Sequence, residues 1–462
     1  MVGKLFLLIR KISLSKWALF FILSIFIFSF AHTKIWKRNQ VFSSDSFIYY
    51  SYLPIAFYEK DYSLEFINKD TSSYYQNLCM YNSPIGHKYV KMTYGVALLE
   101  APFFALAHIT AYFCGYPQNG FSFPYELLCC ISGLLYGLIG FLFLRKVLLN
   151  FFSELITALS IVIIAFGTNL FHYLIYSPTM SHSFNFCLFA VFIFVILKWL
   201  DKPNTILSIY TGLLYGLIVL IRPSNAIIIV FPLLYDVRKF QDIKDRFRFF
   251  IRNYKHIIII IILTFIVFVP QMLYWYKVSG QFVLYSYSNE KFFFSNPHLI
   301  YGLFGYRKGW LIYTPIMSFS IIGFIFLYLK MRKLFWSVFL FTLLNIYIIF
   351  SWWCWWYGGS FGARAMIESY ALLAFPLASF ISFITKKLLV SIPVMLIAGF
   401  LIFLNIFQSY QCSITLIHWD SMSKKAYWGV FLKKTWPNGY SDMLRTPDYE
   451  NASKNLPEEV VK

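Results

Sequence analysis

Long apolar runs recur along almost the entire chain, and they constrain its fold more than any other feature. Eleven of them are long enough, or nearly long enough, to cross a lipid bilayer as helices. They cover residues 16–33, 124–144, 154–175, 183–199, 205–221, 224–236, 257–275, 311–329, 334–351, 366–384 and 388–409. A helix satisfies its own backbone hydrogen bonds, which lipid cannot do. The runs therefore predict an all-α polytopic membrane protein.

Charge is scarce in this chain and unevenly placed. Only 13% of the 462 residues are charged and 59% are hydrophobic, whereas a soluble domain carries roughly 25% charge. The net charge of +20 would suit a nucleic-acid partner, but the basic residues stand in short clusters between apolar runs. That placement is typical of membrane topology signals, so we reject a nucleic-acid-binding function.

A further apolar run, residues 94–113, contains Glu100, Pro102 and His108. If this run crossed the membrane, the basic clusters that follow it would alternate between the two sides. If it lies along the surface, they all face the side of the N-terminus, as the positive-inside rule favours. We therefore expect about eleven transmembrane helices over residues 1–409, with interfacial helices in the first outer loop.

This assignment collects polar residues on the side away from the basic loops. That outer side holds the loops 34–123 and 276–310 and a short tail, residues 410–462, which has too few apolar residues for a sizeable core of its own. In the first loop, Asp45 precedes an aromatic stretch that includes Tyr49. Asp45 fits two roles that are compatible: the N-cap of a helix and a general base held at the membrane surface.

Several cations share the outer side with Asp45. His87 and Lys91 precede the run 94–113, and they suit either a lipid phosphate or the snorkelling anchor of a surface helix. Arg307 and Lys308 stand between glycines just before a span, where a bidentate guanidinium contact can hold a phosphate. Lipid headgroups are the alternative partner for such residues.

Two more candidate cations lie beside unusual segments. Arg222 precedes Pro223 at the end of a short span, and Arg364 follows the segment SWWCWWYGGSFGA, residues 351–363. The tryptophans exceed an ordinary interface belt, and their rings could stack on a sugar. A transporter would place ionisable groups at mid-span in two related halves. Here these groups gather at one interface, which favours a site open to the membrane surface.

With these residues the chain resembles the bacterial GT-C-type integral membrane glycosyltransferases, the class that includes protein O-mannosyltransferases and the lipid A aminoarabinose transferase. The resemblance rests on an acid in the first outer loop, SSDSFIYY, and on KMTYGVALLEAPF, GLLYGLIVLIRPSN, YRKGWLIYTP and WWYGGSFGARAMIESY in that order. The class has an acidic pair where this chain has Asp45 followed by Ser46. Because of this departure there is only one candidate base. Whether the protein needs a divalent metal stays open, and the resemblance implies no other cofactor.

The resemblance implies a GT-C-like fold and transfer of a sugar from a polyprenyl-phosphate donor to an acceptor hydroxyl, with inversion. Asp45 would be the base. Arg307, helped by Lys308, Lys91 or Arg222, would bind the lipid phosphate, and the segment ending at Arg364 would shape a cavity. The expected location is the bacterial inner membrane, with the site facing the periplasm or exterior. The acceptor could be a glycan, lipid or protein. A transporter or flippase of a polyprenyl-linked glycan is the alternative function.

Overall fold

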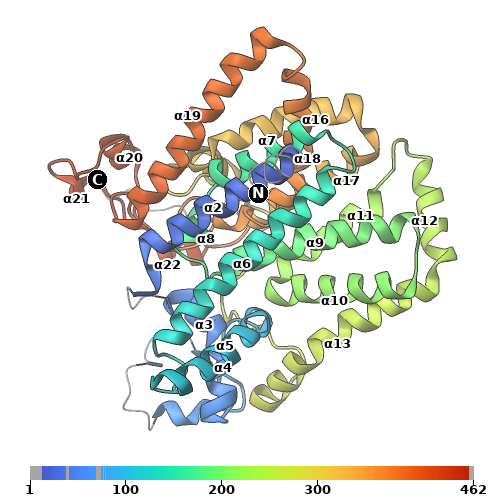
Figure 1. Cartoon of the computed structure of the whole chain (residues 1–462). Helices are drawn as coiled ribbons and strands as arrows, with labels where there is room; N and C mark the ends of the chain where they lie inside the picture. The colour runs from blue at the N-terminus through green and yellow to red at the C-terminus, as the bar shows by residue number, and fades with distance from the viewer. Residues whose placement is uncertain (1–12, 38–40, 69–73, 76–77, 79, 457–462) are drawn as a thin grey trace, which may run out of the picture.

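The computed structural model describes residues 13–37, 41–68, 74–75, 78 and 80–456. The remaining parts of the expected transmembrane domain, first outer loop and tail lie outside the described residues. Within the described part the chain is predominantly helical, as the apolar runs predict, with one short β-hairpin in the first outer loop (Figure 1).

The α-helices are α2 (Leu14–Thr33), α3 (Ser44–Tyr50), α4 (Tyr52–Pro54), α5 (Gly95–Cys114), α6 (Phe123–Leu148), α7 (Glu154–Gly167), α8 (Leu170–Ile175), α9 (Ser181–Asp201), α10 (Thr205–Ile221), α11 (Val230–Leu234), α12 (Asp242–Arg252), α13 (Tyr254–Ser279), α14 (Leu299–Phe304), α15 (Trp310–Tyr313), α16 (Ser318–Lys330), α17 (Arg332–Phe350), α18 (Tyr370–Ile384), α19 (Leu388–Ser413), α20 (Lys424–Val430), α21 (Tyr440–Met443) and α22 (Tyr449–Ser453). Shorter helical turns are η1 (Ile35–Lys37), η2 (Ile55–Glu59), η3 (Glu65–Asn68), η4 (Pro223–Ile229), η5 (Pro315–Met317) and η6 (Arg364–Met366). The antiparallel strands β1 (Met80–Asn82) and β2 (Lys88–Val90) pair Met80 with Val90.

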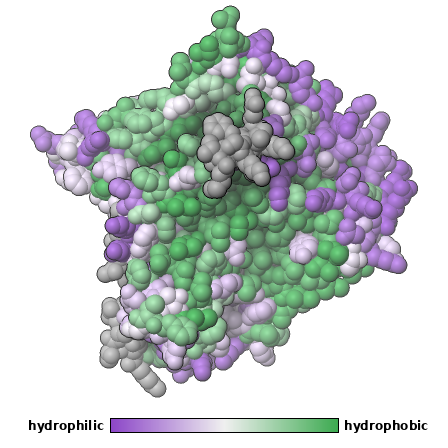
Figure 2. All heavy atoms as spheres, in the orientation of Figure 1, coloured by the Kyte–Doolittle hydropathy of each residue, from purple (hydrophilic) through white to green (hydrophobic). Residues whose placement is uncertain are grey.

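All eleven apolar runs are mainly helical, but several are not continuous α-helices. The run 311–329 is interrupted at Thr314, between α15 and η5, and the run 224–236 consists of η4 and α11. The run 154–175 divides into α7 and α8 at Thr168, whose backbone is extended. Among the described residues, seven helices are long and apolar enough to cross a membrane: α2, α5, α6, α9, α13, α17 and α19. The protein is therefore a largely α-helical membrane protein with several candidate spans, and Figure 2 shows broad apolar surface over its helices.

The core lies around α9 and α18, whose side chains are almost all buried. Helices approach each other closely there because glycines replace bulkier residues at the crossings. A Cβ atom on Gly323 of α16 would lie 2.0 Å from the carbonyl oxygen of Pro376 in α18. A Cβ atom on Gly133 of α6 would lie 1.8 Å from the carbonyl oxygen of Pro178. No side chain fits such gaps, so these glycines fix the distances between helices.

Segments rich in basic residues meet at one end of the helices. The Asp236 amide donates a hydrogen bond of 2.7 Å to the carbonyl oxygen of Lys333. The ammonium group of Lys333 lies 4.8 Å from the ring centre of Phe151. The segments that follow α6 and α11 therefore lie beside the first turn of α17.

Both ends of α5 contact segments that adjoin the first outer loop. At its start, a Cβ atom on Gly95 would lie 2.6 Å from the side chain of Ile221, the last residue of α10. Towards its end, His108 Nδ1 lies 2.8 Å from the hydroxyl of Tyr125 in the first turn of α6. Between these points α5 packs against Tyr50 of α3.

The tail does not form a separate domain. Its helices α20 and α21 pack on the end of α19 and on two residues of the membrane domain, Tyr313 and Phe361. The tail therefore shares a hydrophobic core with the membrane domain. This agrees with its sequence, which has too few apolar residues for a sizeable core of its own.

Candidate functional site

Helix α3 fixes the position of Asp45. The N-cap of α3 is Ser43 and not Asp45, which corrects the role suggested by the sequence. Ser43 has an extended backbone, and its amide donates to the Ser46 hydroxyl at 3.3 Å. Asp45 is already in the first helical turn, where a carboxylate interacts favourably with the helix dipole.

Asp45 forms an ion pair with Arg364, which comes from the opposite end of the sequence. Arg364 Nη2 donates a hydrogen bond of 2.7 Å to Asp45 Oδ2. Burial raises the pKa of the Asp45 carboxyl, but the positive charges of Arg364, Lys91 and Arg222 outweigh burial, so the pKa lies below its usual value of 3.8. Asp45 is therefore a carboxylate at neutral pH.

One cavity opens beside this pair, with a volume of about 370 Å³. We call it the cationic cavity. Its ionisable lining residues are Asp45, Lys91, His182, Arg222, Glu290 and Arg364. Its aromatic lining residues are Tyr49, Trp275, Tyr285, Tyr287, Phe292, Trp352, Trp353 and Tyr357. Lys91, Arg222 and Arg364 thus line the same cavity as several aromatic rings. Cations and flat apolar rings together suit a phosphate that is attached to an apolar group or to a ring.

Two acids hold the cations of this cavity in place. Glu368 Oε1 lies 3.0 Å from His182 Nδ1 and 3.5 Å from Arg222 Nη1, and the Glu368 side chain is 2% exposed. Glu290 pairs with Lys91 and accepts a hydrogen bond of 3.1 Å from Trp353 Nε1. Arg222 is therefore positioned by Glu368, which does not line the cavity, and Lys91 by Glu290, which does. Both cations are held in place before a ligand binds, as preorganised binding groups are.

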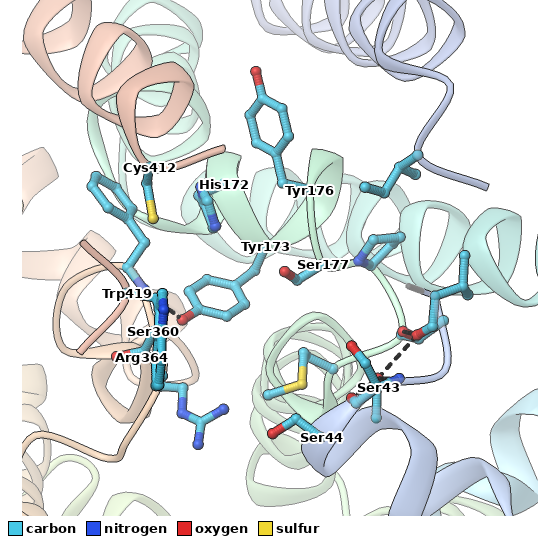
Figure 3. Close-up of a pocket in the computed structure, with 18 of the residues that line it drawn as sticks. Ser43, Ser44, His172, Tyr173, Tyr176, Ser177, Ser360, Arg364, Cys412 and Trp419 are labelled. Atoms are coloured by element: carbon cyan, nitrogen blue, oxygen red, sulfur yellow. Dashed lines mark hydrogen bonds between the residues drawn. The ribbon is translucent and has the colours of Figure 1, made fainter. Parts of the chain in front are cut away.

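A second cavity, of about 210 Å³, lies on the other side of Arg364. We call it the hydroxyl cavity. Its polar lining residues are Ser43, Ser44, Ser46, His172, Tyr173, Tyr176, Ser177, Thr179, Ser360 and Arg364. Figure 3 shows Ser360, Arg364 and Trp419 on one wall and Ser43 and Ser44 on the facing wall.

Two residues that line this cavity each have a fully buried nitrogen without a hydrogen-bond partner in the described part of the chain. The two nitrogens are His172 Nδ1 and Arg364 Nε. Buried polar atoms are rarely left without a partner in folded proteins. Many hydroxyl groups together with such nitrogens suit a ligand that carries several hydroxyls itself.

Trp419, from the tail, forms part of the rim of the hydroxyl cavity. Its side chain is 53% exposed, and its backbone oxygen accepts a hydrogen bond of 3.0 Å from the Ser360 amide. A Cβ atom on Gly359 would lie 2.9 Å from the Trp419 ring, so the absence of a side chain at Gly359 lets the ring lie on the backbone. A half-exposed indole held in this way offers a flat apolar face to a ligand.

The Asp45–Arg364 pair separates the two cavities. Arg364 lines both of them, Asp45 lines the cationic cavity, and its neighbours Ser43 and Ser44 line the hydroxyl cavity. The carboxylate therefore faces the cationic cavity, and Arg364 is the residue that the two cavities share. Molecules bound in two adjoining cavities are held close to each other, as a reaction between them needs.

The structure brings together five of the eight residues singled out from the sequence. They are Asp45, Tyr49, Lys91, Arg222 and Arg364, all on the cationic cavity.

The remaining three candidates lie elsewhere. His87 is partly exposed, and its Nδ1 atom lies 3.4 Å from Oε1 of Glu65. Arg307 stacks on Trp356 at 5.1 Å and donates to the carbonyl oxygen of Arg445 at 3.4 Å. Lys308 is buried and donates to the carbonyl oxygen of Ser360, and burial lowers its pKa to about 8.

Sequence reasoning missed Glu368, His182 and Glu290 as members of the site. Glu368 and His182 each stand at the start of an apolar run, where an ionisable residue is costly unless it has a partner. That cost was a usable signal for both. Glu290 gave no comparable signal, since it lies in a polar loop.

Among the described residues, no group of three or more His, Cys, Asp or Glu side chains has the geometry of a metal site. No known protein-family model matches the chain, and no curated protein sequence matches it significantly.

Proposed function

We propose that this chain is a GT-C-like membrane glycosyltransferase that moves a sugar from a polyprenyl-phosphate donor to an acceptor hydroxyl, with Asp45 as the base. One observation carries the proposal. The ionised carboxylate of Asp45 faces a cavity rich in cations and aromatic rings, and its partner Arg364 also lines a cavity rich in hydroxyl groups. A transporter would have no need of a carboxylate at the junction of two binding spaces.

The cationic cavity suits the donor. Arg222 and Lys91 would bind the phosphate, and the aromatic rings would contact the sugar and the first isoprene units. Arg307, which lies outside this cavity, has no role in the proposal. Lys308 has no role in phosphate binding either, because it lies outside the cavity and donates to a backbone carbonyl.

The hydroxyl cavity suits the acceptor. Its serines, His172 and Arg364 can hydrogen-bond to a polar molecule, and Trp419 can stack on the face of a ring. The acceptor hydroxyl would then point towards Asp45 past the edge of Arg364.

The reaction is a displacement at the anomeric carbon of the donor sugar. The acceptor oxygen forms a bond to that carbon while its proton passes to the Asp45 carboxylate. The bond between the anomeric carbon and the phosphate oxygen breaks, and its electron pair leaves with the polyprenyl phosphate. Arg222 and Lys91 stabilise the negative charge that develops on the departing phosphate. One displacement of this kind inverts the configuration.

The proposal includes the membrane topology. Eleven spans with α5 on the surface place the cavities on the outer side of a bacterial inner membrane, where lipid-linked sugars replace nucleotide sugars as donors. By length and composition α5 could also span, but two observations support a surface position. Its two ends contact the end of α10 and the start of α6, and three basic segments meet at one end of the helices. Cysteine labelling tests this topology. In a variant in which the native cysteines, including the exposed Cys114, are replaced by serine, single cysteines are placed at Glu126 and at Lys386. A membrane-impermeant reagent should label intact cells only at position 126.

The release of free polyprenyl phosphate distinguishes a glycosyltransferase from a flippase, because a flippase leaves the lipid-linked sugar intact. A deletion strain should accumulate one polyprenyl-phosphate sugar, which can be extracted and identified by mass spectrometry. The purified wild-type protein, mixed with this extract and an envelope fraction as acceptor, should release free polyprenyl phosphate. If the protein moves the lipid across vesicle membranes and leaves it intact, the transferase proposal is wrong.

A further inference from the structure

Helix α12 carries an apolar stripe that no other part of the described chain covers. Phe240 precedes the helix, and Ile243, Phe247 and Ile251 follow at intervals of three or four residues, which places them on one face. Their side chains are 86%, 41%, 66% and 56% exposed in that order. Large apolar side chains that are exposed together on one face mark a surface that something else covers.

The other faces of this segment are strongly basic. Residues 238–255 contain seven Lys and Arg and two Asp, an excess of five positive charges. The two acids have local partners. Asp242 accepts hydrogen bonds from the backbone amides of Arg238 and Lys239, and Asp245 pairs with Arg248 at 3.0 Å. Lys244, Arg252 and Lys255 are exposed and add positive charge beside the stripe.

The position of α12 is that of a helix at a membrane surface. It connects α11 to α13 and runs crosswise to α10 and α11 past their ends (Figure 1). Hydrophilic side chains gather on the same side of the molecule (Figure 2). Phe249 and Phe250 attach α12 to Trp199 of the protein, and the rest of its surface is an apolar stripe flanked by cations. A short helix of this kind across the ends of spans fits the boundary between headgroups and acyl chains.

The apolar surface beside α12 favours lipid over a protein partner as its cover. The next helix, α13, is long and apolar enough to span the membrane. Only 11% of the residues in its most apolar 18-residue stretch are buried in the protein. Its exposed residues include Ile258, Ile261 and Phe265, which need acyl chains around them. The stripe on α12 thus leads directly into a lipid-facing helix.

From these observations we propose that α12 and its flanking cations bind anionic phospholipid at the membrane surface. The stripe enters the acyl boundary. Lys244, Arg252 and Lys255 extend to the headgroups, and their positive charges select phosphatidylglycerol-like lipids over zwitterionic ones. This site is separate from both cavities, and the proposal does not depend on the glycosyltransferase assignment.

The test places a photoreactive residue on the stripe of the full-length protein. p-Benzoylphenylalanine replaces Phe247, and the protein is reconstituted in nanodiscs that contain equal amounts of phosphatidylglycerol and phosphatidylcholine. Irradiation should yield lipid adducts, at least about twofold enriched in phosphatidylglycerol. The same group in place of Asp245, on the opposite face of α12, should yield far fewer adducts.

A charge variant tests the selectivity. In the Phe247-labelled protein, K244Q/R252Q should return the adducts to the bulk lipid ratio, while K425Q/K434Q, a matched pair of exposed tail lysines, should leave the enrichment unchanged. Adducts to a second protein chain at position 247, or equal lipid ratios with and without K244Q/R252Q, would overturn the proposal.

Discussion

Arg364 Nη2 and Asp45 Oδ2 lie 2.7 Å apart although 319 positions separate the two residues in the sequence. The pair joins the first outer loop to the segment before α18, and both cavities meet at it. The ionic state of Asp45 therefore depends on a residue that also contacts both proposed ligands.

This dependence gives a pH prediction. Because the pKa of Asp45 lies below 3.8, its base form persists on acidification, and activity should show no acid limb from Asp45 between about pH 5 and about pH 8. Arg364→Met removes the largest opposing charge from the Asp45 carboxyl, which is only partly exposed, so its pKa should rise and activity should begin to fall at a higher pH than in the wild type. Rates of polyprenyl-phosphate release measure both profiles. Arg364→Lys, which keeps the charge, should resemble the wild type, and an unchanged profile in active Arg364→Met would refute the coupling.

A second prediction concerns Glu368. The substitution Glu368→Gln leaves Arg222 and His182 without their shared carboxylate in a buried setting. Loss of one partner from a buried ion pair costs about 3 kcal/mol, so the unfolding temperature in detergent should fall clearly. Glu450→Gln removes an exposed partner of Lys454, and it should produce no measurable change. Equal unfolding temperatures for the two variants would contradict the role of Glu368.

The sequence predicted the helices well because lipid imposes a simple rule on apolar runs. Each of the eleven runs is mainly helical, and the interruptions at Thr168 and Thr314 are clear departures. Beside Thr168, the Asn169 side chain has distant partners: it accepts a hydrogen bond of 2.7 Å from the Tyr370 hydroxyl and donates one of 3.3 Å to the carbonyl oxygen of Phe361. Such partners come from distant segments, and a local pattern does not show them.

The site was harder to predict for the same reason. Asp45, Lys91, Arg222 and Arg364 could be grouped because the sequence predicts that all four lie on the outer side of the membrane. The same argument grouped Arg307 and Lys308 with them, but the tail and Ser360 occupy those two side chains. A sequence assigns residues to one side of a membrane, and only packing decides which of them face one cavity.

Trp419 provides a prediction about the acceptor. Trp419→Ala removes the flat face at the rim of the hydroxyl cavity and should raise the apparent KM for the acceptor about tenfold, with the KM for the donor unchanged. Trp419→Phe should restore part of the loss. Trp436 is exposed to a similar degree, 56%, but does not line either cavity, so Trp436→Ala serves as the control. An increase in the donor KM alone would contradict the assignment of the two cavities.

The close contact of α6 with Pro178 gives a prediction about folding. Gly133→Ala places a methyl group 1.8 Å from a carbonyl oxygen, so the helix must move, and we expect a loss of about 2 kcal/mol in stability. Gly399 lies in α19 with no atom within 4 Å of the position of a Cβ, so Gly399→Ala should leave the stability unchanged or raise it slightly. Thermal unfolding of both variants in one detergent measures the difference.

The role of Asp45 is the centre of this account, and the release of polyprenyl phosphate by purified Asp45→Asn tests it most directly. The substitution preserves the size of the side chain and removes the base. We expect Asp45→Asn to fold, to enter the membrane and to bind the lipid-linked donor, but to release polyprenyl phosphate at least about a hundredfold more slowly than the wild type. Release at a rate near that of the wild type would contradict the account.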